Sequence, residues 1–196
     1  RFWPGWDWLA ERNRAGTFGA PRSVVFRRLG SRPDWSPVYA DDEESGGALV
    51  DLHLHDVDFL RYAFGDPQAV LAGGSLGHVT ALYRYAEGPR HAAAEGGWDH
   101  SGGFPFRMGF LAVFEEATVE YDLGHDPVLV VHRGGSAEPV EVASYSGYDG
   151  EVRHLLEALA EGRRELRVTV EDALATARLL DAERESLRSG DTVKLR

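Results

Sequence analysis

The sequence predicts an α+β domain built on a large open β-sheet. Three observations support this fold class: seven or eight short segments rich in strand-forming residues, one long amphipathic helix among them, and two further helices near the end of the chain. A sheet with that many strands is typical of a large open sheet. The 196 residues suffice for one domain, 1–196, with a substantial core.

The N-terminal part of the chain is expected to form a helix, a strand and a loop. Residues 4–16 begin with a proline and end with a glycine, as a short amphipathic helix does, and Trp6 is expected to anchor it in the core. Residues 23–29 are rich in strand formers. Residues 30–45 contain two prolines and an acidic run, so we expect a solvated loop there.

Residues 46–65 predict the helix around which the domain is organised. An apolar stripe at helical spacing is expected to be buried, a polar stripe lies beside it, and Gly65 followed by Asp66-Pro67 ends the helix. The apolar stripe comprises Val50, Leu54, Val57, Leu60 or Arg61, and Phe64; the polar stripe comprises Asp51, His55, Asp58 and Tyr62.

Asp51 and His55 are four residues apart, so on a helix their side chains are neighbours. A carboxylate can hold or polarise an imidazole, and a histidine that titrates near neutrality can accept a proton from an alcohol. The alternative interpretation is a surface contact without chemistry. The preceding Gly46-Gly47 and the second acid, Asp58, favour the acid–base pair.

The remainder of the chain predicts strands followed by two helices. The loop 97–105 combines glycine pairs with Trp98 and His100, which is unusual for a mere connection, although it could instead pack against a partner subunit. The lone His154 is expected to be structural. The expected strands are 69–72, 78–85, 90–95, 106–114, 118–123, 128–133 and 139–142. One expected helix begins after Gly147 and ends at Gly162, and the other begins after Thr169 and ends at Gly190. An edge strand is expected at 193–195.

Composition restricts the classes of partner. The net charge of −11 argues against nucleic acid or an anionic membrane as a partner. The chain has no cysteine, no apolar run of membrane-spanning length and no signal peptide, so we expect a cytoplasmic protein. Because it starts at Arg1, has its one methionine at Met108 and its one lysine at Lys194, we expect it to be part of a longer protein.

The run G-G-A-L-V-D-L-H-L-H-D-V-D-F-L at residues 46–60 resembles the signature of the C-terminal domain of the Gfo/Idh/MocA (glucose–fructose oxidoreductase / inositol dehydrogenase) family. Asp51, His55 and Asp58 fall on the family's Asp, His and second Asp, whereas His53 stands where the family most often has glycine. The opening Arg-Phe-Trp-Pro and the segment Phe18 to Pro21 extend the resemblance.

The resemblance implies a mixed, predominantly antiparallel sheet with helices on one face, and a dehydrogenase that oxidises a hydroxyl of a sugar, inositol or related polyol. His55 would accept the proton, Asp51 would orient the imidazole, and Asp58 would bind substrate. Trp3, at the junction with the nucleotide domain, and Trp98 and His100 are further substrate-contact candidates.

The resemblance also implies what lies outside this chain. NAD or NADP would be bound mainly by an N-terminal Rossmann domain that is absent here, so the isolated piece is expected to be inactive. No metal site is expected. Family members pair through the open sheet face, which implies a homo-oligomer, and a sheet that is only an assembly platform stays an alternative.

A second alternative is a metal-dependent hydrolase. Asp51, His53 and His55 also match a D-x-H-x-H motif, whose histidines point at one metal when they alternate on a strand. On a helix the same two histidines diverge by about 200 degrees. The helical spacing of the apolar residues favours divergence and therefore the dehydrogenase.

Overall fold

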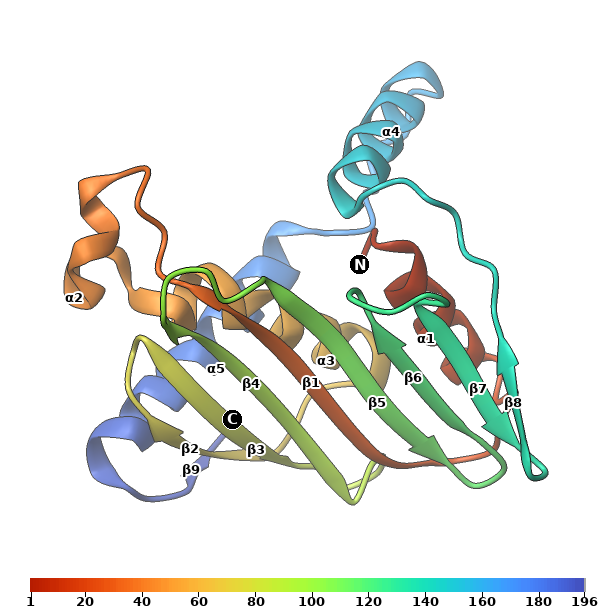
Figure 1. The fold of residues 1–196 in the computed structure, drawn as a ribbon, viewed down its shortest axis with the longest axis horizontal. Coiled ribbons are helices and arrows are strands. Elements are labelled where there is room, and N and C mark those ends of the chain that lie inside the picture. Colours follow the sequence, from red (N-terminus) through yellow and green to blue (C-terminus); the bar gives the residue numbers. More distant parts are fainter. Residues whose placement is uncertain (196) are drawn as a thin grey trace.

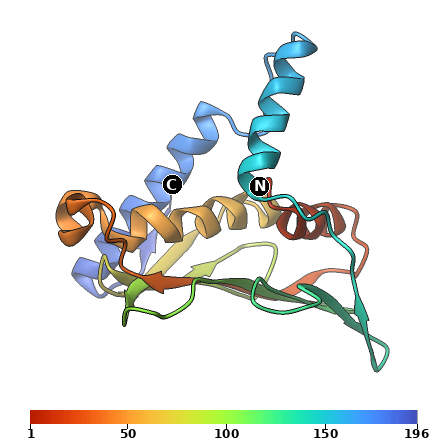
Figure 2. The ribbon, with the colours of Figure 1, turned by 45° about the horizontal axis from the view of Figure 1, so that its top comes forward.

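The computed structural model describes residues 1–195 and folds them into a single sheet with helices on one of its faces (Figures 1 and 2). The helical elements are α1 (Pro4–Arg14), the 3-10 turn η1 (Pro37–Ala40), α2 (Asp42–Ser45), the π-helical turn η2 (Leu49–His53), α3 (Leu54–Phe64), α4 (Gly147–Ala160) and α5 (Val170–Ser189). The strands are β1 (Pro21–Ser31), β2 (Ala69–Gly74), β3 (His78–Arg84), β4 (His91–His100), β5 (Arg107–Phe114), β6 (Thr118–Asp122), β7 (Leu129–Arg133), β8 (Ser136–Pro139) and β9 (Val193–Lys194).

The sheet has the order β8-β7-β6-β5-β1-β4-β3-β2-β9. Its neighbouring strands are antiparallel except β1 and β4, which run parallel in the middle of the sheet. The α+β class and the mixed, predominantly antiparallel sheet are therefore confirmed. Because one face is covered by helices and the other is open, side chains alternate between core and surface along most strands.

The core lies between the sheet and helices α1 and α3, and aromatic rings fill its centre. Trp6 of α1 meets Phe110 and Tyr121 edge to face, with ring centroids 5.0 and 4.6 Å apart. Phe59 of α3 packs in the same manner on Phe26 of β1. Such contacts add to the area that these large side chains bury, so Trp6 is the core anchor that the sequence predicts.

Strand β4 is longer than predicted and removes part of the predicted loop 97–105. Its alanines and glycines are poor strand formers, which is why the strand was predicted too short. The glycines have a packing reason, because a Cβ atom at Gly96 would lie only 2.6 Å from Cβ of His53. The helical segment therefore approaches the strand so closely that only glycine fits. Trp98 and His100 consequently belong to a strand, which corrects their placement in an irregular loop.

Two other predictions need correction. The segment 30–45 is not all loop, because η1 and α2 form within it and Asp41 caps α2 by accepting a hydrogen bond from the Glu43 amide at 2.8 Å. The strand predicted at 139–142 lies earlier, at β8, where a turn through Gly134 and Gly135 pairs it with β7.

The last two helices begin at capping boxes, in which Ser146 pairs with Asp149 and Thr169 with Asp172. Helix α5 packs on α3 and β2, whereas α4 projects away from the sheet (Figures 1 and 2). Three leucines of α4 are consequently exposed: Leu155, Leu156 and Leu159. Among the described residues, no helix has both the length and the apolar character needed to cross a membrane.

Candidate functional site

The residues of the predicted acid–base helix form the turn η2 and the helix α3. A helix in this region is therefore confirmed, but not every side chain faces the side that was predicted. The first turn is π-helical, so its hydrogen bonds run to the fifth residue instead of the fourth. This wider turn puts Leu49 and His53 in the core and leaves Val50 and Leu54 facing a cavity. The predicted buried stripe is therefore wrong at those two positions and right at Val57 and Leu60.

His53 is fully buried in a polar cluster that sequence reasoning missed. Its Nε2 atom lies 3.0 Å from Glu183 Oε2 and 3.2 Å from the hydroxyl oxygen of Tyr83, and the Tyr83 hydroxyl donates to Glu183 Oε1 at 2.8 Å. Burial, followed by the charge of Glu183, raises the pKa of Tyr83 well above its usual value. The cluster joins α5 to the sheet and to η2, so His53 has a structural place.

Asp56, one residue after His55, is the second buried polar group that the sequence did not indicate. It forms a two-pronged ion pair with Arg28 of β1, at 2.8 Å to Nη2 and 3.3 Å to Nε. Arg28 also contacts the sulfur of Met108 and lines the cavity beside His55. The pair therefore fixes a positive charge at the wall of the cavity.

The cavity has a volume of about 520 Å³ and is formed by the chain's first residues, β1, η2, α3 and both C-terminal helices. Pockets of this size bind small organic molecules. The structure brings three predicted site residues to it: Trp3, His55 and Asp58. Other lining residues include Trp6, Arg28, Tyr148, Val168 and Thr176.

His55 has the properties of a base. The side chain lines the cavity, and among residues 1–195 no side chain or backbone group forms a hydrogen bond with its imidazole. Desolvation by the cavity walls, followed by the charge of Arg28, lowers the pKa of His55 below its ordinary 6.5. The imidazole is therefore neutral at pH 7 and able to accept a proton.

Asp51 does not form the expected hydrogen-bonded pair with His55. No such bond joins the two among the described side chains, and Asp51 does not line the cavity. The π-helical turn explains the difference, because Asp51 lies within it and the spacing of four residues no longer superimposes the two side chains. Its negative charge still acts on His55, as the weakest of several influences on the pKa of that imidazole.

Asp58 lines the cavity, but its carboxylate is already paired. Arg1 donates to both oxygens at 2.8 Å, and the Thr176 hydroxyl donates to Oδ1 at 3.2 Å. Trp3 donates its indole N–H to the hydroxyl of Tyr121 at 2.9 Å and presents its ring to the cavity. Asp58 is thus held in place, and the Trp3 ring, against which Gly147 packs, forms part of the cavity wall.

Trp98 and His100 lie away from this cavity, contrary to the expectation that they share a site with His55. Trp98 is fully buried, and its indole donates to Asp42 Oδ1 at 3.2 Å, which fastens α2 to β4. His100 stacks on Phe104, with ring centroids 4.2 Å apart. Neither of the two side chains lines the His55 cavity.

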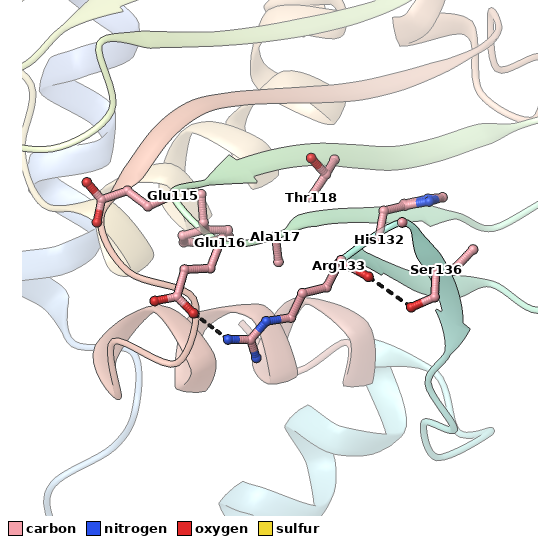
Figure 3. Close-up of a pocket in the computed structure, with 11 residues that line it drawn as sticks. Glu115, Glu116, Ala117, Thr118, His132, Arg133 and Ser136 are labelled. Carbon is pink, nitrogen blue, oxygen red and sulfur yellow. Dashed lines mark hydrogen bonds and ion pairs between the residues drawn. The ribbon is translucent and has the colours of Figure 1, made fainter.

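A second depression of about 480 Å³ lies at the turns between β5 and β6 and between β7 and β8 (Figure 3). It is bordered by Glu115, Glu116 and Arg133, and Glu116 and Arg133 form an ion pair across it. The predicted site residues do not line this depression.

The arrangement of the two histidines argues against the metal-hydrolase alternative. His53 points into the core towards Glu183, whereas His55 lines the cavity. Within residues 1–195, the group of side chains spaced to hold a metal ion contains neither of them nor Asp51. A shared metal at the D-x-H-x-H motif is therefore not supported.

Comparison with solved structures reveals the same fold in several dehydrogenases. An aldose–aldose oxidoreductase from Caulobacter crescentus, solved with glycerol, superimposes with a TM-score of 0.82 over 100% of this chain and 62% of its own, at 22% identity. A myo-inositol dehydrogenase from Corynebacterium glutamicum gives a TM-score of 0.76 over 100% and 62%, at 17% identity. The chain thus spans less than two thirds of these relatives.

Sequence comparison identifies the family. An uncharacterized oxidoreductase from Synechocystis is 36% identical over 81 residues, which cover 39% of this chain and 22% of that protein. Residues 6–103, half of the chain, match the family described as the GFO/IDH/MocA C-terminal domain. The chain belongs to the GFO/IDH/MocA family of oxidoreductases.

Proposed function

We propose that this chain is the substrate-binding and proton-transferring domain of an NAD(P)-dependent dehydrogenase that oxidises a hydroxyl of a sugar, inositol or related polyol. His55 is the proton acceptor. The observation that carries the proposal is a neutral imidazole without a protein partner in the described chain, held at the wall of a cavity large enough for a monosaccharide.

The cavity walls suit such a substrate. Trp3 offers an aromatic face to the apolar side of a sugar ring, while Arg28 and Asp58 provide charge near the hydroxyl groups. Because Asp58 is held by Arg1 and Thr176, it contributes a fixed acceptor rather than a mobile one. A few polar groups on a largely apolar wall give a small ligand its orientation.

In the proposed reaction His55 binds the reacting hydroxyl and takes its proton as the C–H hydride departs. The nicotinamide, when bound, supplies the hydride acceptor. Desolvation, followed by the charge of Arg28, disfavours a proton on His55 before the reaction, while the negative charges of Asp56 and, more weakly, Asp51 favour the imidazolium that forms. Asp51 therefore assists through its charge rather than through a hydrogen bond.

The nicotinamide is held mainly by a dinucleotide-binding domain that precedes this one. One feature supports this part of the proposal: exposed apolar side chains continue from the cavity wall along α4 and occur at the start of α5. Tyr148 belongs both to the cavity and to this exposed surface. A second domain seated there would cover it.

The open face of the sheet supports a homo-oligomer. Three leucines from three strands, Leu71, Leu82 and Leu111, are more than a third exposed on the face that no helix covers. Burying such a patch against a second copy removes apolar surface from water.

The test uses the protein with its dinucleotide-binding domain, screened against sugars, inositols and other polyols with NAD and with NADP. We expect His55→Ala to lower kcat by about 100-fold to 10,000-fold, the usual contribution of a general base. His125→Ala, at an exposed turn, is the matched control and should retain activity. Full turnover in His55→Ala would refute the role of His55. Reduction of NAD or NADP that does not depend on an added sugar, inositol or other polyol would refute the substrate class.

A further inference from the structure

Three potential metal ligands meet at one end of β3 and β4. His78 begins β3, and Asp99 and His100 end β4. One ligand atom from each of the three side chains lies within 4.8 Å of the other two. None of the three lines the His55 cavity, so the cluster has no part in the proton transfer proposed above.

The distances suit a transition-metal ion. His78 Nδ1 lies 2.6 Å from Asp99 Oδ1, and His100 Nδ1 lies 3.9 Å from the same oxygen. A tetrahedral zinc ion with bonds of about 2.0–2.2 Å holds its ligand atoms about 3.3 Å apart. These two separations lie on either side of that value, and the third is within 4.8 Å, so rotation of the side chains could bring all three atoms onto one ion.

His100 presents a nitrogen that nothing in the described protein satisfies. Its Nδ1 atom is buried and has no hydrogen-bond partner within residues 1–195. The ring cannot easily turn away, because it stacks on Phe104, and Ser31 fastens the intervening loop by donating to the Ser101 and Phe104 carbonyl oxygens. A buried nitrogen without a partner is costly, and a metal ion would satisfy it.

His78 is oriented as metal-bound histidines usually are. Its Nε2 atom lies 3.2 Å from Glu95 Oε1, and the second oxygen of Glu95 accepts from Arg27 at 2.8 Å. A carboxylate on Nε2 fixes the tautomer of a metal-bound histidine. Nδ1 would then be the metal ligand, with the ion taking the place of the hydrogen bond that now joins Nδ1 to Asp99. The ring lies directly on Gly97, where a Cβ atom would come within 2.6 Å of His78 Nδ1.

We propose that His78, Asp99 and His100 form a binding site for a divalent transition-metal ion of the zinc type. Two imidazoles and one carboxylate are ligands that such ions accept, and a water molecule would occupy the fourth position. Glu95 is a positioning residue that acts through His78. The site differs from the D-x-H-x-H alternative and departs from the expectation that the chain holds no metal.

Calorimetric titration of the tag-free, chelator-treated 196-residue chain with Zn²⁺ tests the proposal, and Co²⁺ absorption reports the ligand geometry. We expect one saturable equivalent that excess Mg²⁺ does not displace. His100→Ala and Gly97→Ala should weaken binding by about 10-fold or more, and Glu95→Gln by about 10-fold to 100-fold. The matched control is His132→Ala, which removes an exposed histidine beside Glu120.

The absence of one saturable equivalent in the wild type would overturn the proposal, as would equal weakening by His132→Ala and His100→Ala. Circular dichroism of each metal-free variant shows whether it is folded. Should a ligand variant unfold, Glu95→Gln still decides, because it leaves all three ligands in place. Unchanged affinity in a folded Glu95→Gln would contradict the arrangement of His78 described here.

Discussion

Two histidines that are two residues apart on one helical segment have opposite surroundings. His53 is fully buried and meets Glu183 and Tyr83, whereas His55 has no protein partner in the described chain and faces a cavity of about 520 Å³. The separation follows from the helix, because two residues represent about 200 degrees of rotation. One imidazole is thereby held in the core, and the other lines the cavity, as the proposed role of a base requires.

The comparison shows that surroundings, not residue type, decide what a histidine does. Charged and hydroxyl groups that approach His53 are fixed on β3 and α5, so they can stabilise the fold but cannot exchange with a ligand. Desolvation is the main cause of the lowered pKa of His55, and the charge of Arg28, which buried Asp56 holds in place, lowers it further. A buried acidic side chain therefore lies behind each histidine: Glu183 contacts His53 directly, and Asp56 holds Arg28 beside His55.

Glu183→Ala tests the structural half of the comparison and should have the largest effect. It leaves His53 and Tyr83 buried without their acidic partner, and breaking a buried polar pair in this way costs about 3–5 kcal/mol. Urea unfolding of the 196-residue chain measures the loss. The matched control is Glu185→Ala, an exposed position on the same helix, whose unfolding free energy should change by less than about 0.5 kcal/mol.

The same urea unfolding measurement distinguishes the roles of the two histidines. His55→Ala removes no hydrogen bond within the described chain, so its unfolding free energy should stay within about 0.5 kcal/mol of the wild type. A loss in His55→Ala as large as that in Glu183→Ala would contradict the division between a structural and a chemical histidine.

Asp51→Asn should have the smallest effect. Asp51 forms no hydrogen bond with His55 in the described chain and acts on it through charge alone, an influence worth less than about 1 kcal/mol, so kcat/KM should fall less than about 5-fold. Steady-state kinetics of the protein with its dinucleotide-binding domain measures this change. A loss as large as that in His55→Ala would mean that the two side chains form a hydrogen-bonded pair during the reaction.

The sequence predicted most elements because periodicity and end signals agree there. Thr169 with Asp172 marks the start of α5 in both the sequence and the structure. At β4 the prediction failed because long-range packing overrides local preference. Gly96 and Gly97 look like a loop, yet they form a strand because His53 and His78 lie against them. The spacing of apolar residues gives no signal for the π-helical turn at η2. The sequence therefore could not predict that Asp51 lies away from the cavity and forms no hydrogen bond with His55 in the described chain.

Three of the six predicted site residues line one cavity. His55, Asp58 and Trp3 could be placed together because the resemblance covers the residues that carry them. Trp98 and His100 could not, since the direction of a side chain at a strand end depends on register, and β4 runs further than its composition suggests. Asp58 is bound by Arg1 and Thr176, which lie 57 and 118 residues away along the chain. No local sequence pattern predicts contacts between residues so far apart.

The pH dependence of kcat/KM for polyol oxidation tests the central claim most directly. His55 must be neutral to accept a proton, and its pKa is lowered below 6.5, so activity should be constant around pH 7 and fall as the pH drops through a midpoint below 6.5. His55→Ala should remove this limb. An acidic limb that persists unchanged in His55→Ala would contradict the assignment of His55 as the base.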